Sequence, residues 1–336
     1  MLRPMDMDTA NALRWHPGDT GHVESHFLKA NSPDGRRAVW VKHTVFAPEA
    51  ADREAVAEVW AIAFDRDGGE RFPVGGKQSV PVDEARFDDR PFRIVAAGSE
   101  LRSGEARGQV DREGHLLRWD LRYEPRQPPF RTYPSELMYR GRFPKLKSLT
   151  PCPDGIFSGS LEVDGERWEV DRWPGMQGHN WGRGHLDIYA WAHCNSWDGD
   201  VKDVWFEAGC GKLRMGPIMS PWLGVAALHI DGHTIRFDGP RGVLPRAVQV
   251  GFDRWRFRFE APGHVLHGDI AADPSRMAGL YYRNPAGPTT HCLNSKLARA
   301  TLRLERPGRP TTTLSTQKIA LEIGTHDPDH GVRMVA

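Results

Sequence analysis

Apolar and polar side chains alternate with a period of two residues along much of the chain. In the segment 117–123, Leu, Trp, Leu and Tyr alternate with Arg, Asp and Arg. The segment 254–259 alternates Arg with Trp and Phe in the same way. This period predicts half-buried strands of antiparallel sheets. The segments 39–46 and 57–64 are rich in Val and aromatic residues, and they predict strands that are buried over more of their surface.

Turn signals join such strands into hairpins. Asp164-Gly165 and Asp231-Gly232 each stand between alternating apolar runs. Asp-Gly in this setting is a strong signal for a tight hairpin turn. Helical patterns are scarce, with about two turns expected over 48–56 and about one over 133–139. The sequence therefore predicts an all-β protein built from antiparallel barrels or sandwiches.

The length indicates more than one structural unit. A chain of 336 residues corresponds to about two domains. Strand patterns continue on both sides of a dense motif that ends near residue 193. We expect an N-terminal β-domain over residues 12–188 and a C-terminal β-domain over residues 189–336.

Tryptophan and turn-forming residues are both abundant, with 12 Trp, 35 Gly and 26 Pro. Gly and Pro at this frequency favour many turns over long helices. Tryptophan suits both cores and ligand pockets, because it combines a large apolar ring with one N–H donor. We expect Trp40, Trp60 and Trp119, which lie in the predicted strands, to be core residues.

Charge and hydropathy narrow the range of partners. Lys and Arg number 45 against 44 Asp and Glu, a net charge of +1, which argues against nucleic acid or an anionic membrane as a partner. The sequence contains no run of about 18 apolar residues, so it predicts no transmembrane helix. The first residues lack the apolar region of a secretory signal, and the four Cys form no close pair. We therefore expect a cytoplasmic protein with free thiols.

The segment 173–193 gathers most of the candidate chemistry, with three His, three Trp, one Gln, one Asn and one Arg. If residues 177–181 are extended, Gln177, His179 and Trp181 share one face, because side chains alternate along a strand. That face presents an amide, an imidazole and an indole together. These groups can hydrogen-bond to a ligand, protonate it and stack on it.

The His-Asn-Trp-Gly sequence at 179–182 is similar to a signature of the carotenoid 1,2-hydratase, tocopherol cyclase and AttH-like superfamily. Further segments that resemble its bacterial tocopherol-cyclase-like branch are Glu24–Asn31, Ala38–Thr44, Glu58–Phe64, Cys292–Ala298 and Ala320–Gly324. The resemblance implies two packed lipocalin-like β-domains with a hydrophobic ligand cavity. It also implies hydration or cyclisation of an isoprenoid or polyene without a redox cofactor.

The resemblance also indicates site residues. A His-x-Trp pair of the hydratase branch maps onto His179 and Trp181, and we expect His179 and Gln177 to orient or protonate the substrate. That branch uses a downstream carboxylic acid as proton donor, for which Asp187 and Glu207 are the candidates by position. The residues expected to bind the substrate are Asn180, Trp181, Tyr189, Trp191, His193 and Trp205.

The expected activity is that of a cofactor-free cyclase, hydratase or isomerase acting on a hydrophobic small molecule. An aromatic pocket suits protonation of a double bond by a carboxylic acid. Burial raises the pKa of the acid so that it keeps its proton, and aromatic faces stabilise the carbocation that forms. The segment 182–185 departs from the usual ending of the hydratase signature, which speaks against hydration of a carotenoid. The alternative is a lipocalin-like carrier of a lipophilic ligand. The 177–181 face could also be a structural hinge between the barrels.

No cofactor or metal is expected. The spacing of His179, His185 and His193 matches no zinc-ligand pattern. The chain also lacks the phosphate-binding pattern of P-loop proteins and the nucleophile elbow of hydrolases.

Overall fold

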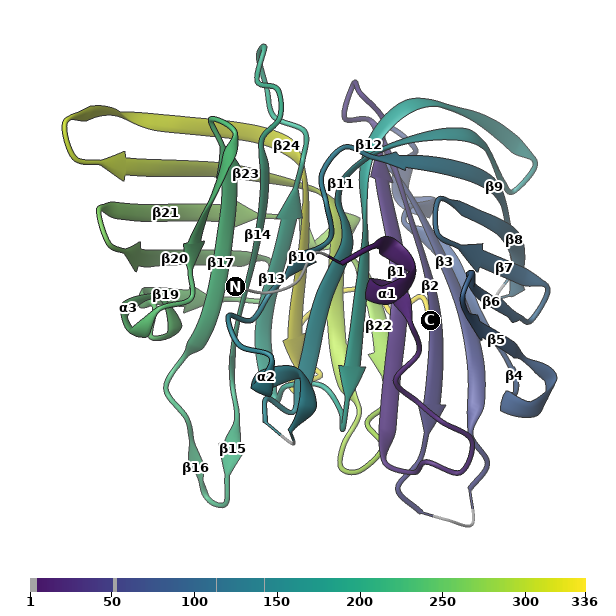
Figure 1. Ribbon diagram of the computed structural model, residues 1–336. Coiled ribbons are helices and arrows are strands. Elements are labelled where there is room, and N and C mark those ends of the chain that lie inside the picture. The colour runs from purple at the N-terminus through teal and green to yellow at the C-terminus, as the bar shows by residue number, and fades with distance from the viewer. Residues whose placement is uncertain (1–4, 51–52, 113, 142) are drawn as a thin grey trace.

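The computed structural model describes residues 5–50, 53–112, 114–141 and 143–336. Nearly all regular structure in these residues is antiparallel β-sheet, arranged as two large curled sheets that lie side by side (Figure 1). This confirms the all-β prediction. The fold places the strands of the 173–193 segment at the junction of the two sheets.

The first sheet has the spatial order β4-β3-β2-β1-β12-β11-β9-β8-β7-β6-β5, and β10 pairs with β11. Its strands are β1 (His22–Asn31), β2 (Arg37–Ala47), β3 (Val56–Asp65), β4 (Val74–Pro81), β5 (Arg86–Asp89), β6 (Phe92–Ala96), β7 (Ser99–Arg102), β8 (Glu105–Arg112), β9 (His115–Pro125), β10 (Phe130–Arg131), β11 (Leu146–Val163) and β12 (Glu166–Gly182). The sheet curls far enough that β4 also contacts β8 and β9.

The second sheet has the order β18-β17-β14-β13-β24-β23-β21-β20-β19, and β22 pairs with β23. Its strands are β13 (Ile188–Cys194), β14 (Trp205–Lys212), β17 (Leu223–Ile230), β18 (His233–Phe237), β19 (Arg246–Val250), β20 (Arg254–Ala261), β21 (His264–Ala271), β22 (Ala278–Tyr282), β23 (Thr290–Arg306) and β24 (Arg309–Thr325). A separate hairpin consists of β15 (Arg214–Met215) and β16 (Ile218–Met219).

Helices are short. The described α-helices are α1 (Met7–Asn11), α2 (Leu137–Arg140) and α3 (Pro240–Val243), and the single-turn 3-10 helices are η1 (Gly69–Arg71), η2 (Val82–Glu84) and η3 (Pro274–Arg276). The turn expected over 133–139 corresponds to α2. The expected helix over 48–56 is wrong for residues 48–50 and 53–56, which are not helical, and residues 51–52 lie outside the described residues. No described helix is long and apolar enough to cross a membrane.

Both predicted Asp-Gly hairpins are present. Val163 pairs with Glu166 across the β11–β12 turn, and Ile230 pairs with His233 across the β17–β18 turn. Asp164 and Gly165 have φ of +50° and +83°, the positive values that a type I′ turn requires at both central residues. Asp and Gly tolerate this region better than other residues, which explains the strength of the sequence signal.

The described residues form four apolar clusters, one within each curled sheet, one between the sheets and a small one around Trp15. Trp119 and Trp168 belong to the cluster inside the first sheet, and Trp255 to the cluster inside the second. Trp40 and Trp60 of the first sheet pack with β22 and β23 of the second in the cluster at the junction. Trp40, Trp60 and Trp119 are at most 2% exposed, as predicted for core residues, and Trp40 also lines a cavity at the junction.

The chain changes from one sheet to the other between the end of β12 at Gly182 and the start of β13 at Ile188. The first sheet is therefore formed by residues before this connection, and the second by residues after it. The expected division into domains of residues 12–188 and 189–336 remains a prediction. Between the sheets, β11 contacts β14, and β1, β2 and β3 contact β23.

Candidate active site

A cavity of about 260 Å³ lies at the junction of the two sheets. Its wall is mostly apolar and aromatic, and strands of both sheets contribute to it. The polar and aromatic residues of this wall include Lys42, Trp40, Tyr133, Ser148, Asn180, His185, Tyr189, Trp191, Glu207, Tyr282 and Glu322. An apolar cavity with a few polar groups is the usual form of a small-molecule site.

Glu207 is a buried carboxyl on this wall. It lies on β14, opposite His193 of β13 and Ala227 of β17, and it is 5% exposed. The Thr150 hydroxyl donates a hydrogen bond to Oε2 at 2.6 Å, and the Trp191 indole N–H donates one to Oε1 at 3.2 Å. Burial raises the pKa of Glu207, although these two donors oppose the shift. The geometry therefore suits a carboxyl that holds a proton at higher pH than a free one does.

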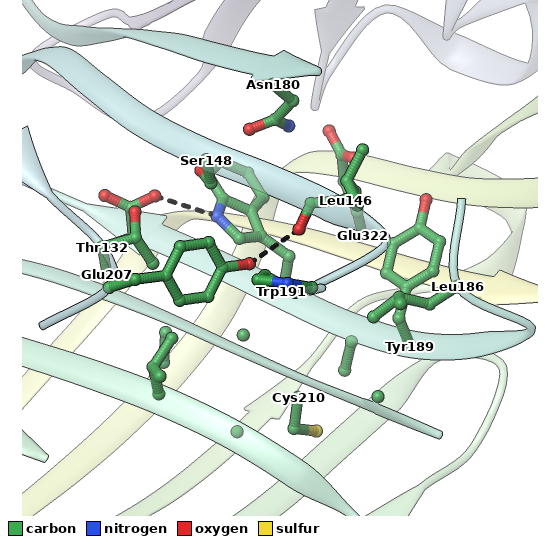
Figure 2. A pocket seen from close by; sticks show the side chains of 18 of the residues that line it. Thr132, Leu146, Ser148, Asn180, Leu186, Tyr189, Trp191, Glu207, Cys210 and Glu322 are labelled. Atoms are coloured by element: carbon green, nitrogen blue, oxygen red, sulfur yellow. Dashed lines mark hydrogen bonds between the residues drawn. The ribbon is translucent and has the colours of Figure 1, made fainter. Parts of the chain in front are cut away.

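Trp191 separates Glu207 from a second polar group of the wall. Figure 2 shows Glu207 on one side of the indole and Glu322 with Tyr189 on the other. Glu322 pairs with the buried Lys296 at 2.7 Å, and the Lys296 ammonium lies 5.4 Å from the centre of the Trp191 ring. The wall therefore has two chemically different ends, with an ion pair at one and, at the other, a carboxyl that has no ionic partner among the described residues.

Several phenols line or border the cavity. The Tyr133 hydroxyl donates to the Leu146 carbonyl at 3.0 Å (Figure 2), and the Tyr139 hydroxyl donates to the Ser148 carbonyl at 3.3 Å. Burial raises the pKa of Tyr133, and it raises that of Tyr189 in the same way. These phenols therefore stay neutral and present aromatic faces to a ligand.

Gln177, His179 and Trp181 share one face of β12, but that face is turned away from the cavity. It is covered by residues 10–15, which we call the N-terminal clasp. The His179 ring lies 2.7 Å from both the Ala10 carbonyl, through Nδ1, and Glu24 Oε1, through Nε2. Gln177 and Asn11 exchange two amide hydrogen bonds of 2.9 and 3.2 Å. In the described structure, none of the three is part of the cavity wall.

Glu24 anchors the clasp from β1. Its carboxylate accepts the backbone N–H groups of Arg14 and Trp15 at 2.8–3.0 Å, and it also faces His22 and His179. Burial raises the pKa of Glu24, but the hydrogen bonds from His179 and His22 outweigh it and hold the pKa below its ordinary range. The carboxylate is therefore ionised and fully hydrogen-bonded.

Glu24, His26 and His179 could also be considered as metal ligands, because their candidate ligand atoms lie within 4.8 Å of one another. The His26 ring faces the Asn11 carbonyl at 2.8 Å and stacks on His179 at 4.0 Å between ring centres. Both nitrogens of His179 face oxygen atoms of the clasp and of β1, Nδ1 the Ala10 carbonyl and Nε2 the Glu24 carboxylate. These contacts suit a set of groups that fastens the clasp to the sheet.

The structure brings four of the expected site residues together on the cavity wall, namely Asn180, Tyr189, Trp191 and Glu207. Three others lie elsewhere. Asp187 accepts the Arg214 backbone N–H at 3.0 Å near the surface. Trp205 is 2% exposed and stacks on His229. His193 is buried, and its Nε2 faces the Pro153 carbonyl at 2.8 Å.

Sequence reasoning did not identify Thr150, Tyr133 or Lys42 as parts of the site. Thr150 and Tyr133 carry no recognisable pattern, because their role depends on contacts between strands that are distant in sequence. Lys42 does carry a signal. It is a charged residue inside the run 39–46, whose other residues predict a strand buried over most of its surface.

The comparisons agree with this architecture. The sequence profile of the tocopherol cyclase-like family matches residues 77–325. An uncharacterized protein of Mycobacterium tuberculosis is 26% identical over 322 residues, which cover 93% of this chain and 90% of that protein. The chloroplastic tocopherol cyclase of Zea mays is 27% identical over 115 residues, or 33% of this chain and 24% of that protein.

One solved structure extends the likeness to the whole fold. The crystal structure of an AttH-like protein from Nitrosomonas europaea has a TM-score of 0.52 and 16% identity, covering 99% of this chain and 100% of that one. This likeness shows a common fold of two curled antiparallel sheets, as the resemblance of the sequence implied. From the profile match over most of its length, the chain belongs to the tocopherol cyclase-like family.

Proposed function

We propose that the protein is a hydratase, cyclase or isomerase that protonates a double bond of an apolar substrate, with Glu207 as the acid. The observation that carries this proposal is the buried Glu207 carboxyl on the wall of an apolar cavity, held there by Thr150 and Trp191. Membership of the tocopherol cyclase-like family supports the same type of reaction.

In the proposed reaction, Glu207 donates its proton to one carbon of the double bond. The π electrons form the new C–H bond, and the other carbon becomes a cation. The carboxylate that remains keeps the hydrogen bonds from the Thr150 hydroxyl and the Trp191 indole, which stabilise its negative charge. Aromatic faces of the wall stabilise the cation.

The outcome depends on what captures the cation. Water gives a hydration product, a hydroxyl of the substrate closes a ring, and loss of a neighbouring proton gives an isomer. In each case a proton is released and returns to the Glu207 carboxylate, so the acid is regenerated. Asn180 is a candidate for positioning the capturing oxygen, because its buried Oδ1 has no hydrogen-bond partner in the described structure.

The substitution Glu207→Gln tests the acid, because it removes the transferable proton and keeps the size of the side chain. The assay incubates an acyclic prenylated hydroquinone and, separately, a polyunsaturated fatty acid in D₂O and measures deuterium incorporation by mass spectrometry. A general acid contributes about 10²–10⁴-fold to a rate, so we expect turnover to fall by at least about 100-fold. Binding of the hydroquinone should change little.

Asp187→Asn is the matched control, because Asp187 is the other acid that the sequence suggested and it lies outside the described cavity wall. It should retain the wild-type rate. Turnover of Glu207→Gln at the wild-type rate would overturn the role of Glu207. Tight binding without any deuterium incorporation by the wild type would favour the carrier function over the enzyme.

A further inference from the structure

Lys42 is a buried cation on the cavity wall. It lies on β2, is 4% exposed and lines the cavity together with Trp40 and Tyr282. Its Nζ is 3.7 Å from the centre of the Tyr282 ring, 5.2 Å from that of Trp60 and 5.8 Å from that of Trp40. Three aromatic rings therefore surround the ammonium group, and their faces compensate for part of the water that it has lost.

The nearby carboxylates are already paired with other cations. Glu322 pairs with Lys296 at 2.7 Å, and Glu58 pairs with Lys77 at 3.4 Å and with Arg283. Among the described residues, no carboxylate lies within 4.0 Å of the Lys42 ammonium. A buried charge without an ionic partner is costly, so such an arrangement favours a ligand that supplies the missing negative charge.

Lys42 is the positively charged group of the described cavity wall. Burial lowers the pKa of Lys42 to about 8, so the side chain is largely protonated at neutral pH. His185 also lines the cavity, and burial together with the charge of Lys42 lowers the pKa of this imidazole to about 3. The neutral imidazole leaves Lys42 as the positive group of the cavity wall in the described structure.

Lys42 and Glu207 belong to different parts of the wall. Lys42 comes from the first sheet and is influenced by Glu322, which lies across the Trp191 indole from Glu207 (Figure 2). The Lys296 ammonium lies 5.4 Å from the centre of the Trp191 ring and 5.6 Å from that of Trp40, so these two indoles of the cavity wall border the same buried cation. A ligand that spans the wall would meet an acid at one end and a cation at the other.

We propose that Lys42 binds the carboxylate of an otherwise apolar ligand, whose double bond then lies toward Glu207. The inference rests on the proposed function for the reacting end of the ligand. Recognition of the ligand's carboxylate rests on Lys42, whose ammonium group has no carboxylate partner among the described residues. The substrate class is thus an unsaturated apolar carboxylic acid.

The test compares cis-parinaric acid, a fluorescent polyene fatty acid, with its methyl ester. The two probes share the apolar chain and differ in the negative charge, so their relative affinity measures recognition of the carboxylate. Wild-type protein should bind the acid at least about tenfold more tightly than the ester, a difference of about 1.4 kcal/mol. This comparison needs no variant and therefore does not depend on whether a variant folds.

Lys42→Met removes the charge and keeps an unbranched side chain, and it should bring the two affinities within about twofold of each other. Lys77→Met is the matched control. Lys77 also lies close to the Trp60 ring, at 4.4 Å, but it is outside the described cavity wall. It should keep the preference for the acid.

Equal binding of acid and ester by the wild type, or an unchanged preference in Lys42→Met, would overturn the role of Lys42. Either result leaves the Glu207 proposal standing, because the ester still reports an apolar site. Failure of both probes to bind would contradict the ligand cavity and both proposals. Failure of the acid role alone is seen separately, as unchanged turnover in Glu207→Gln.

Discussion

At the residue scale, the proposed chemistry depends on the balance of forces on one carboxyl. Burial raises the pKa of Glu207, while the hydrogen bonds from Thr150 and Trp191 lower it. The first effect keeps the proton available for transfer, and the second stabilises the carboxylate after transfer. The same two donors therefore tune both the starting and the final state of the acid.

This balance predicts the effect of Thr150→Val. Loss of the hydroxyl removes one interaction that lowers the pKa of Glu207, so the pKa should rise. A general acid must be protonated, so activity falls as pH rises through this pKa. The midpoint of that fall should move to higher pH in Thr150→Val. The carbonyl stretch of the protonated carboxyl, followed by infrared difference spectroscopy, should show the same shift without any assay of turnover.

Ser148→Ala is the control for this prediction. Ser148 lines the same cavity, and no described hydrogen bond joins its hydroxyl to Glu207. Its midpoint should match that of the wild type. A midpoint that stays in place or moves to lower pH in Thr150→Val would show that the hydroxyl does not stabilise the carboxylate.

At the element scale, β12 has one face under the N-terminal clasp and the other on the cavity. Gln177, His179 and Trp181 face the clasp, and Asn180 faces the cavity. The period of the strand predicts that the first three share a face. It does not predict which face of β12 lines the cavity, because both faces are largely buried and the pattern of apolar residues does not distinguish them.

The sequence could not predict that the clasp covers Gln177, His179 and Trp181, and the reason is physical. The clasp begins with the last two residues of the five-residue helix α1, which is too short to show a periodic pattern. Its attachment depends on Glu24 and on pairs far apart in sequence, such as Asn11 with Gln177. Local patterns did predict the strands, the two hairpins and the buried Trp40, Trp60 and Trp119. Four residues of the cavity wall, Asn180, Tyr189, Trp191 and Glu207, could also be predicted. Thr150 and Tyr133 could not, because their place depends on contacts between strands that are distant in sequence.

The two faces of β12 predict opposite effects for neighbouring substitutions. His179→Ala removes one partner of the buried contact with Glu24, which typically costs about 3–5 kcal/mol of unfolding free energy. Molecules that remain folded should keep a near-wild-type turnover. Urea unfolding and the D₂O assay together measure both effects.

Asn180→Ala provides the contrast within the same strand. Its Oδ1 has no hydrogen-bond partner in the described structure, so its loss should change the unfolding free energy by less than about 1 kcal/mol. Turnover should fall instead, because Asn180 lies on the cavity wall. An inactive but fully stable His179→Ala would support the catalytic role that the sequence suggested for His179.

At the scale of the whole molecule, the cavity exists because two sheets meet. Lys42, Ser148 and Asn180 come from the first sheet, and Trp191 and Glu207 come from the second. A ligand that fills the cavity therefore contacts both sheets at once. Its binding energy should stabilise them together.

Hydrogen exchange with and without cis-parinaric acid measures this coupling. At a free ligand concentration of about 100 times Kd, binding stabilises the native state by about 2.7 kcal/mol. Protection of backbone amides should increase in β2 and β12 of the first sheet and also in β13 and β14 of the second. Increased protection confined to one sheet would show that the ligand binds within a single sheet and not at the junction.

The two covered faces of β12 also affect how such proteins diverge. A substitution at His179 should affect the stability of the fold, while one at Asn180 should affect the interaction with the ligand. A descendant can therefore keep the His-Asn-Trp motif intact and acquire a new substrate through changes on the opposite sheet, around Trp191 and Glu207. In such a descendant the shared motif would mark the common fold, and the change of substrate would lie at cavity positions outside the motif.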